Sequence, residues 1–121
     1  MLTVGVDIIE IGRVQGAIER RGERFLRRVY TDAELALYRD RIAELAARFA
    51  GKEAAMKALG TGLRGISWKE IEILPNRRGK PLVFLHGRAK ERAKSLGISE
   101  LAISLSHSDN FAIASVVGGA P

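Results

Sequence analysis

The segment RIAELAARFAGKEAAMKALG, residues 41–60, carries the clearest helical pattern in the chain and sets the plan of the fold. Its apolar side chains recur at helical spacing along one stripe, and a glycine follows at the position of a helix C-cap. The pattern therefore predicts a helix over 41–59 that buries this stripe. The stripe consists of Ile42, Leu45, Phe49, Met56 and Leu59, with Gly60 as the cap.

Strands and further helices are predicted on both sides of this helix. Because they mix without regular βαβ alternation, we expect one α+β domain over 1–121, with a mainly antiparallel sheet packed on one long helix. The predicted strands cover 2–9, 67–74, 82–86, 100–106 and 111–117. The predicted helices cover 12–28, broken or weakened at Gly22, then a short helix opened by the capping box TDAE at 31–34, and 87–97.

Composition limits the classes of protein that this chain can belong to. A length of 121 residues leaves room for one modest core. The absence of cysteine excludes disulfides and thiolate metal sites and is compatible with a reducing cytoplasm. No basic leader region precedes the first strand, and no apolar stretch approaches the length of a membrane span. We therefore expect a soluble, cytoplasmic protein with no membrane partner.

The charge balance favours anionic partners. Twenty Lys and Arg against fourteen Asp and Glu give a net charge of +6, which suits nucleic acid, a phosphorylated cofactor or an acidic protein. Only 6% of the residues are aromatic, and no basic segment is interleaved with Phe or Tyr, so a base-stacking platform for single strands is poorly supported. Binding to a nucleic-acid groove or backbone stays open at this point.

Charged groups occupy two elements that are otherwise apolar. The first strand carries Asp7 in its middle. The long helix sets Glu53 and Lys57 beside the apolar stripe, with Lys52 on the other flank and Arg48 one turn earlier. Burying such groups is costly unless they are paired or bound to something.

Each of these groups also has a structural explanation. Glu53 and Lys57 have the favourable order of an exposed i, i+4 ion pair, and a lysine can carry its ammonium past an apolar face into water. Asp7 could accept hydrogen bonds from backbone amides. Taken together, however, two carboxylates on apolar elements with a lysine beside one of them match a small magnesium site for phosphate chemistry, which needs few hard oxygen ligands.

His107 is a further candidate, because it lies where the strand 100–106 ends and the turn HSDN begins. A lone histidine at a strand end is usually structural, and a metal role lacks a second ligand of the Cys or His type. Contact with an anionic ligand is the functional interpretation.

Four motifs follow one another in a characteristic order: GVDIIEIGRV, RFAGKEAAMKALGTG, GKP and SLSHSDNFAIASVV. In this order and spacing the chain resembles the holo-[acyl-carrier-protein] synthases, the small bacterial-type members of the 4'-phosphopantetheinyl transferase superfamily, from residue 3 to about 117. The combination of a first-strand Asp with KEAxxKA on a long helix is the specific part. The GKP motif alone would mean little.

The resemblance implies an activity and roles for particular residues. Such enzymes transfer the 4'-phosphopantetheine group of coenzyme A to a serine of apo acyl carrier protein, with Mg²⁺, and release adenosine 3',5'-bisphosphate, in fatty acid biosynthesis. Asp7 and Glu53 match the metal-binding carboxylates, and Lys57 matches a lysine that meets the pyrophosphate and assists the leaving group. Glu53 is the expected base for the serine, directly or through a water. Arg48 and His107 match contacts to the adenosine phosphate end, and Ser108 keeps the hydroxyl that relatives often supply as Thr.

The resemblance also implies protein partners. Six arginines and two glutamates lie between residues 13 and 28, and Arg13, Arg20 and Arg24 would share one face if the predicted helix is continuous. This face is expected to dock the acidic carrier protein, although it could also be an ordinary solvated face. The family's small members are trimers with shared active sites, and a trimer interface would cover a sheet face that 121 residues can hardly cover alone. Neither nucleic acid nor membrane is an expected partner.

Two questions stay open at this level. Gly51 stands inside the long helix where Ala would be usual, at a cost of roughly 1 kcal/mol, and no sequence pattern explains it. A non-enzymatic basic module that binds RNA or DNA is the rival class, with salt-dependent binding and no need for magnesium or coenzyme A. A relative that binds coenzyme A but acts on another carrier, or on none, is a third.

Overall fold

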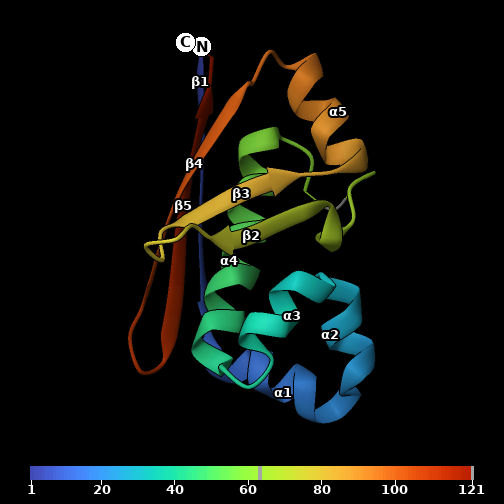
Figure 1. The fold of residues 1–121 in the computed structure, drawn as a ribbon, viewed down its shortest axis with the longest axis vertical. Helices are drawn as coiled ribbons and strands as arrows, with labels where there is room; N and C mark the ends of the chain where they lie inside the picture. Colours follow the sequence, from blue (N-terminus) through green and yellow to red (C-terminus); the bar gives the residue numbers. More distant parts are fainter. Residues whose placement is uncertain (63, 121) are drawn as a thin grey trace.

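The computed structural model describes residues 1–62 and 64–120 (Figure 1). Its strands and helices follow the predicted order, and the two chain ends lie side by side at one end of the molecule. The strands are β1 (Leu2–Glu10), β2 (Ile71–Pro75), β3 (Pro81–Leu85), β4 (Glu100–His107) and β5 (Phe111–Gly119). The helices are α1 (Ile11–Arg21), α2 (Glu23–Val29), α3 (Asp32–Tyr38), α4 (Ile42–Leu59) and α5 (Gly87–Ser95), with a short 3-10 turn η1 (Trp68–Glu70).

The strands form two antiparallel sheets, so the prediction of one mainly antiparallel sheet needs correction. One sheet has the order β1-β5-β4 and the other is the hairpin β2-β3. The predicted strand 67–74 begins late, at Ile71, because Ser67 and Glu70 form a capping box that starts η1 instead. The two sheets meet where β3 packs beside β4.

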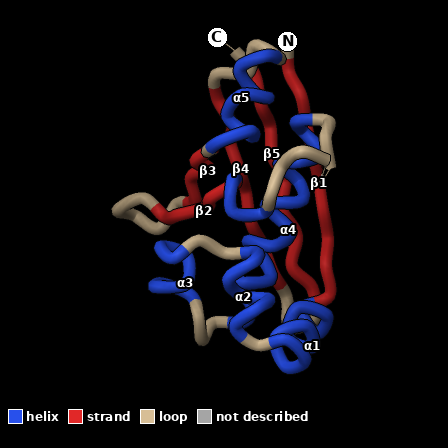
Figure 2. The backbone as a smooth tube through the Cα atoms, turned by 90° about the vertical axis from the view of Figure 1, so that its right-hand side faces the viewer, coloured by secondary structure: helices blue, strands red, loops and turns tan. Residues whose placement is uncertain are grey.

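Helix α4 lies along the inner face of the three-stranded sheet and contacts β1, β5 and β4 (Figure 2). Buried alanines on α4 allow the strands to approach closely. At Gly5 of β1 the contact is between backbones, since a Cβ there would overlap the carbonyl oxygen of Ala54. The Thr3 hydroxyl donates a hydrogen bond to the Ala58 carbonyl oxygen at 2.7 Å. Strand β1 and helix α4 are therefore held at a short, well-defined separation.

The helical pattern over 12–28 was predicted to break or weaken at Gly22, and the structure shows a break into two helices, because Gly22 adopts φ 55° between α1 and α2. That left-handed backbone conformation favours glycine and cannot continue a helix. The next prediction is confirmed, since the Thr31 side chain accepts from the Glu34 amide and the Glu34 carboxylate accepts from the Thr31 amide. A complete capping box thus begins α3.

Lys52 is fully buried, and it has a partner that the sequence pattern did not indicate. Its ammonium donates to Glu34 Oε1 at 2.8 Å and to the carbonyl oxygens of Trp68 and Ile71. The other carboxylate oxygen of Glu34 accepts from the Ile73 amide at 2.8 Å. Burial lowers the pKa of Lys52, while the Glu34 carboxylate acts against this shift. The lysine is a structural tie between α4, α3 and β2.

The structure explains the glycine in the middle of α4. A Cβ at Gly51 would lie 2.7 Å from Ile73 Cδ1, 3.0 Å from Ile103 Cδ1 and 3.3 Å from Leu105 Cδ2. These side chains come from the hairpin and from β4, so Gly51 is the point where both sheets pack on the helix. Glycine lowers the intrinsic stability of the helix at this position, but it allows this close packing.

The outer face of the three-stranded sheet is apolar and exposed. Residues of β1 and β5 alternate between the α4 side and this outer side, and the register pairs Val4 with Val117 and Ile8 with Ile113. The exposed apolar side chains of this face are Leu2, Val4, Val6, Ile8, Phe111, Ile113 and Val117. We call these seven residues the outer sheet face. Of the helices in the described part of the chain, none is long and apolar enough to cross a membrane.

Candidate active site

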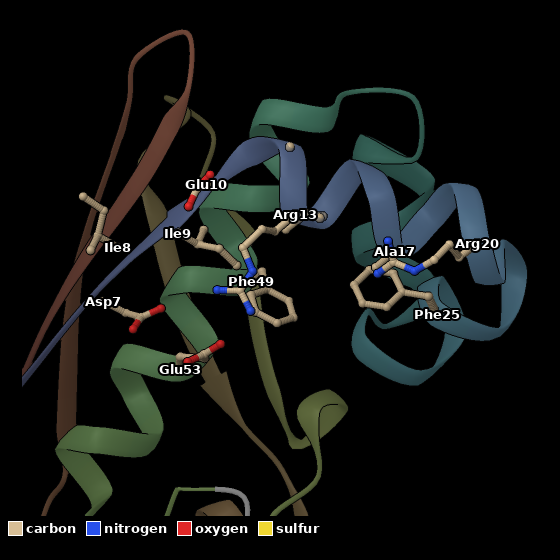
Figure 3. Close-up of a pocket in the computed structure, with 12 residues that line it drawn as sticks. Asp7, Ile8, Ile9, Glu10, Arg13, Ala17, Arg20, Phe25, Phe49 and Glu53 are labelled. Carbon is tan, nitrogen blue, oxygen red and sulfur yellow. The ribbon is translucent and has the colours of Figure 1, made fainter.

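A cavity of about 580 Å³ opens where β1 ends, α1 begins and α4 passes beneath (Figure 3). Asp7, Arg13 and Glu53 line it. Odd-numbered residues of β1 face α4, which is why the alternation of the strand directs Asp7 inward. In Figure 3 Asp7 and Glu53 lie beside each other, one on β1 and the other on α4, and Arg13 reaches toward them from α1. The predicted pair of carboxylates therefore comes together in one cavity.

Lys57 lies one turn beyond Glu53 and reaches back to β1. Its ammonium donates to Asp7 Oδ1 at 3.1 Å and to the Val6 carbonyl oxygen at 2.9 Å. The Lys57 side chain is 55% exposed, whereas that of Asp7 is 13% exposed. Thus the two lysines of the KEAxxK motif have different environments: Lys52 is locked in the core, and Lys57 is free to meet solvent or a ligand.

The surroundings of Glu53 in the cavity disfavour the ionised form of its carboxyl group. Burial raises the pKa of Glu53, and the negative charge of Asp7 raises it further, while the cations Lys57 and Arg13 act in the opposite direction. Two carboxylates that repel each other in this way favour a cation between them. The cavity is therefore suited to bind positive charge in addition to that of the lysine.

These residues fit a magnesium ion, although no group of three or more His, Cys, Asp or Glu side chains gathers as a metal cluster in residues 1–62 and 64–120. Mg²⁺ is commonly bound by one or two carboxylates, with waters and substrate phosphates completing its shell. Asp7 and Glu53 supply that donor set from two elements whose backbones are in contact. A rigid strand and a rigid helix are good supports for such ligands.

The arginines predicted to share one helix face are arranged around two adjoining cavities instead. Arg13 and Arg20 line the cavity of Asp7 and Glu53, while Arg20 and Arg24 line a second one of about 630 Å³. The break at Gly22 is the reason, because it turns Arg24 onto α2. Phe25 and Phe49 line both cavities, and Arg21, Arg28, Val29 and Trp68 complete the second. We call Arg13, Arg20, Arg21, Arg24 and Arg28 the arginine rim.

Arg48 and His107 share a different cavity of about 530 Å³, which we call the Arg48 pocket. Gly79 and Pro81 of the GKP motif also line it. None of its lining residues lines the cavity of Asp7 and Glu53. Ser108 lies in the following turn, where its hydroxyl accepts from the Phe111 amide at 3.2 Å. In a single chain the predicted adenosine contacts and the predicted metal ligands are thus in separate places.

Sequence reasoning missed several residues around these cavities. Tyr38 and Arg41 line the Arg48 pocket. Trp68 stacks on Phe49 with ring centroids 4.7 Å apart, and forms part of the second cavity. Nothing local could have found them, because each approaches its neighbours through tertiary packing. The one available signal was composition, because Tyr38 and Trp68 are aromatic residues in a chain that has few of them.

Comparison with known proteins identifies the class of protein. Residues 3–116 match the model of the 4'-phosphopantetheinyl transferase superfamily. The chain is 54% identical to a holo-[acyl-carrier-protein] synthase of Herpetosiphon aurantiacus, with 98% of each chain covered. The chain therefore belongs to the 4'-phosphopantetheinyl transferase superfamily.

Solved structures lead to the same branch of that superfamily. A holo-[acyl-carrier-protein] synthase from Neisseria meningitidis is 33% identical, with a TM-score of 0.90 and 98% of each chain covered. One from Helicobacter pylori, in complex with coenzyme A, is 35% identical, with a TM-score of 0.87, 96% of this chain and 99% of that chain being covered. The resemblance predicted from the four sequence motifs is confirmed.

Proposed function

We propose that this chain transfers the 4'-phosphopantetheine group of coenzyme A to a serine of an apo acyl carrier protein and releases adenosine 3',5'-bisphosphate, as a step of fatty acid biosynthesis. The observation that carries the proposal is the pair of carboxylates in one cavity, Asp7 and Glu53, beside Arg13 and Lys57. A transfer between a pyrophosphate and a hydroxyl needs charge neutralisation and positioning, and these four groups provide both.

The proposed reaction assigns one step to each group. The serine oxygen bonds to the phosphorus that carries pantetheine, the bond from that phosphorus to the bridging oxygen breaks, and adenosine 3',5'-bisphosphate leaves with the electron pair. The serine proton passes to Glu53, directly or through a water. Lys57 stabilises the charge on the leaving phosphate. Asp7 and Glu53 would hold Mg²⁺, which when bound neutralises the pyrophosphate.

The arginine rim supports an acidic protein as the acceptor. Its five arginines line the same two adjoining cavities as Phe25, Phe49 and Trp68. Positive side chains around an apolar centre suit an acidic helix that presents an apolar residue, and they speed the encounter by electrostatic steering. An acyl carrier protein of high negative charge is the proposed partner.

A homotrimer with shared sites is the proposed assembly, and two observations support it. The seven apolar residues of the outer sheet face are exposed in one chain, and burying them against further copies would be favourable. The Arg48 pocket and the Asp7 cavity have no lining residue in common. If coenzyme A needs both, a neighbouring copy has to supply one of them.

Intact-protein mass spectrometry tests the activity. The chain, coenzyme A and Mg²⁺ are incubated with an apo acyl carrier protein, and Asp7→Ala is the matched variant. The expected result is a gain of one phosphopantetheine that requires Mg²⁺ and disappears in Asp7→Ala. A folded sample that modifies none of several carriers would overturn the proposal and leave a binding module.

Complementation tests the shared site. Asp7→Ala and Arg48→Ala are each expected to be inactive. Co-expressed in equal amounts, they should recover about one quarter of the sites, because a site is intact only when the Arg48→Ala chain supplies its Asp7 half and the Asp7→Ala chain supplies its Arg48 half. No recovery from a trimeric mixture would show that each chain works alone.

A further inference from the structure

Arg48 is held by an unusual set of contacts. Its side chain is only 4% exposed, and Nη1 donates to Glu44 Oε1 at 3.2 Å. Nη2 donates to the Tyr38 hydroxyl oxygen at 2.8 Å. The guanidinium carbon lies 3.8 Å from the centroid of the same tyrosine ring. Tyr38 therefore contacts Arg48 twice, through its hydroxyl and through its π face.

Tyr38 is itself fixed in place. It is 5% exposed and is the last residue of α3, whose start is set by the capping box of Thr31. On the Arg48 pocket, Arg41 approaches the same ring at 5.4 Å. The ring therefore has a fixed position at the wall of the pocket, with the Arg48 guanidinium in close contact and the Arg41 guanidinium farther away.

Arg48 still has donor capacity for a ligand. A guanidinium carries five N–H donors, and its Nε is buried with no hydrogen-bond partner among the described residues. A buried donor without a partner is rare in native proteins. The same side chain lines a cavity with His107, a second group that can meet an anion. Since Nε is buried, a ligand in this cavity would be met by the Nη N–H groups that Glu44 and Tyr38 leave unused.

We propose that Tyr38 is a positioning residue, which holds the Arg48 guanidinium in the orientation that recognises the phosphate on the adenosine end of coenzyme A. This inference rests on the proposed function and on the resemblance, which matches Arg48 to a contact with the adenosine phosphate end of coenzyme A. Glu44 competes for the same cation from the preceding turn of α4. The hydroxyl and ring of Tyr38 keep the guanidinium from turning wholly toward that carboxylate, so that its remaining Nη N–H groups can donate to a phosphate.

The test compares two ligands that differ in a single phosphate, coenzyme A and 3'-dephospho-coenzyme A. Their dissociation constants are measured by calorimetry, and kcat and KM are measured in the carrier-modification assay. Tyr38→Phe removes the hydroxyl and keeps the ring, whereas Tyr38→Leu removes both. Tyr30→Phe is the matched control, because Tyr30 is a buried tyrosine of the same cluster whose hydroxyl donates to the Leu45 carbonyl oxygen.

We expect Tyr38→Phe to weaken coenzyme A binding about tenfold, the usual effect of losing one hydrogen bond to a charged group. Binding of the dephospho ligand and kcat should stay unchanged, so the preference for the phosphate falls. Tyr38→Leu should lose more of it, and Tyr30→Phe none. A general loss of packing would weaken both ligands alike and would not change their ratio.

The outcomes separate this inference from the function beneath it. If the wild-type chain prefers coenzyme A and Tyr38→Phe retains that preference, the positioning role of Tyr38 is overturned while the function stands. If the wild-type chain binds both ligands equally, the role of Arg48 is wrong, and the inference falls with it. The Tyr38→Phe ratio decides the question even if Tyr38→Leu does not fold.

Discussion

Replacing Gly5 by alanine should separate the strand and the helix that carry the two carboxylates. A Cβ at this position would lie 2.9 Å from the Ala58 nitrogen and 3.0 Å from the Ala54 carbonyl carbon, and it would overlap the Ala54 oxygen. These are backbone atoms of α4, which cannot rotate away as a side chain can. Strand β1 must therefore shift outward, although the hydrogen bond from Thr3 to the Ala58 carbonyl oxygen opposes this movement.

The expected cost is about 3 kcal/mol of unfolding free energy, the upper end of the range for overpacked cores. Gly12→Ala is the matched control, since nothing lies within 4 Å of a Cβ there and the residue is in α1. That variant should gain up to about 1 kcal/mol from helix propensity. The same one-carbon change should thus have opposite signs at the two positions.

Urea denaturation followed by circular dichroism measures both variants, at one protein concentration because assembly would contribute to stability. Transfer activity of Gly5→Ala should also fall, because Asp7 lies two residues along the strand and Glu53 lies beside Ala54 on the helix. A loss below about 1 kcal/mol, with normal activity, would refute the argument that the contact between β1 and α4 fixes the separation of the carboxylates.

Three further predictions concern the charged groups. Lys52→Met should lose about 3–5 kcal/mol of unfolding free energy, because the Glu34 carboxylate stays buried without its cation. Lys52→Met combined with Glu34→Gln should recover much of this loss in the same urea assay. A small loss in the single variant would contradict the stabilising role of the buried Lys52–Glu34 pair. Burial and the charge of Asp7 raise the pKa of Glu53 in the folded state, so its contribution to stability is fully present below the unfolded pKa and is lost as the pH rises through the folded pKa. Without divalent ions, the unfolding free energy of Glu53→Gln minus that of wild type should therefore increase from about pH 4 to about pH 8. An equal difference at both pH values would argue against the raised pKa of Glu53. Mg²⁺ should raise the melting temperature of the wild-type chain in differential scanning fluorimetry but not that of Asp7→Ala, and an equal rise in both would remove Asp7 from the metal site.

The elements that were predicted correctly depend on local signals. The capping box at Thr31 and the glycine cap at Gly60 set the ends of helices through contacts within three or four residues. The alternation of β1 is enough to place Asp7 on the side of the strand that carries Gly5 and Ile9. Local periodicity of this kind also places Glu53 on the flank of the apolar stripe of α4, so both carboxylates could be expected near the packed faces of their elements.

Other features were wrong or out of reach because they depend on contacts between distant residues. Lys52 and Lys57 look alike as charges on the flanks of an apolar stripe, yet one meets Glu34 in the core and the other meets Asp7 at the surface. The shared face of Arg13, Arg20 and Arg24 was predicted only for a continuous helix, and the positive φ of Gly22 breaks that helix. A glycine inside a predicted helix does not reveal by itself whether the helix bends, continues or ends.

The sequence alone therefore determined which groups could perform chemistry, and its motifs determined the family. Tertiary structure alone decided which groups meet: Asp7 with a lysine 50 positions away, Glu34 with one 18 positions away, and Arg48 with Tyr38. The physical reason is that helix and strand patterns report hydrogen bonds and burial over a few residues, whereas the free energy of a buried charge depends on partners that only the packing of α4 against both sheets brings within reach.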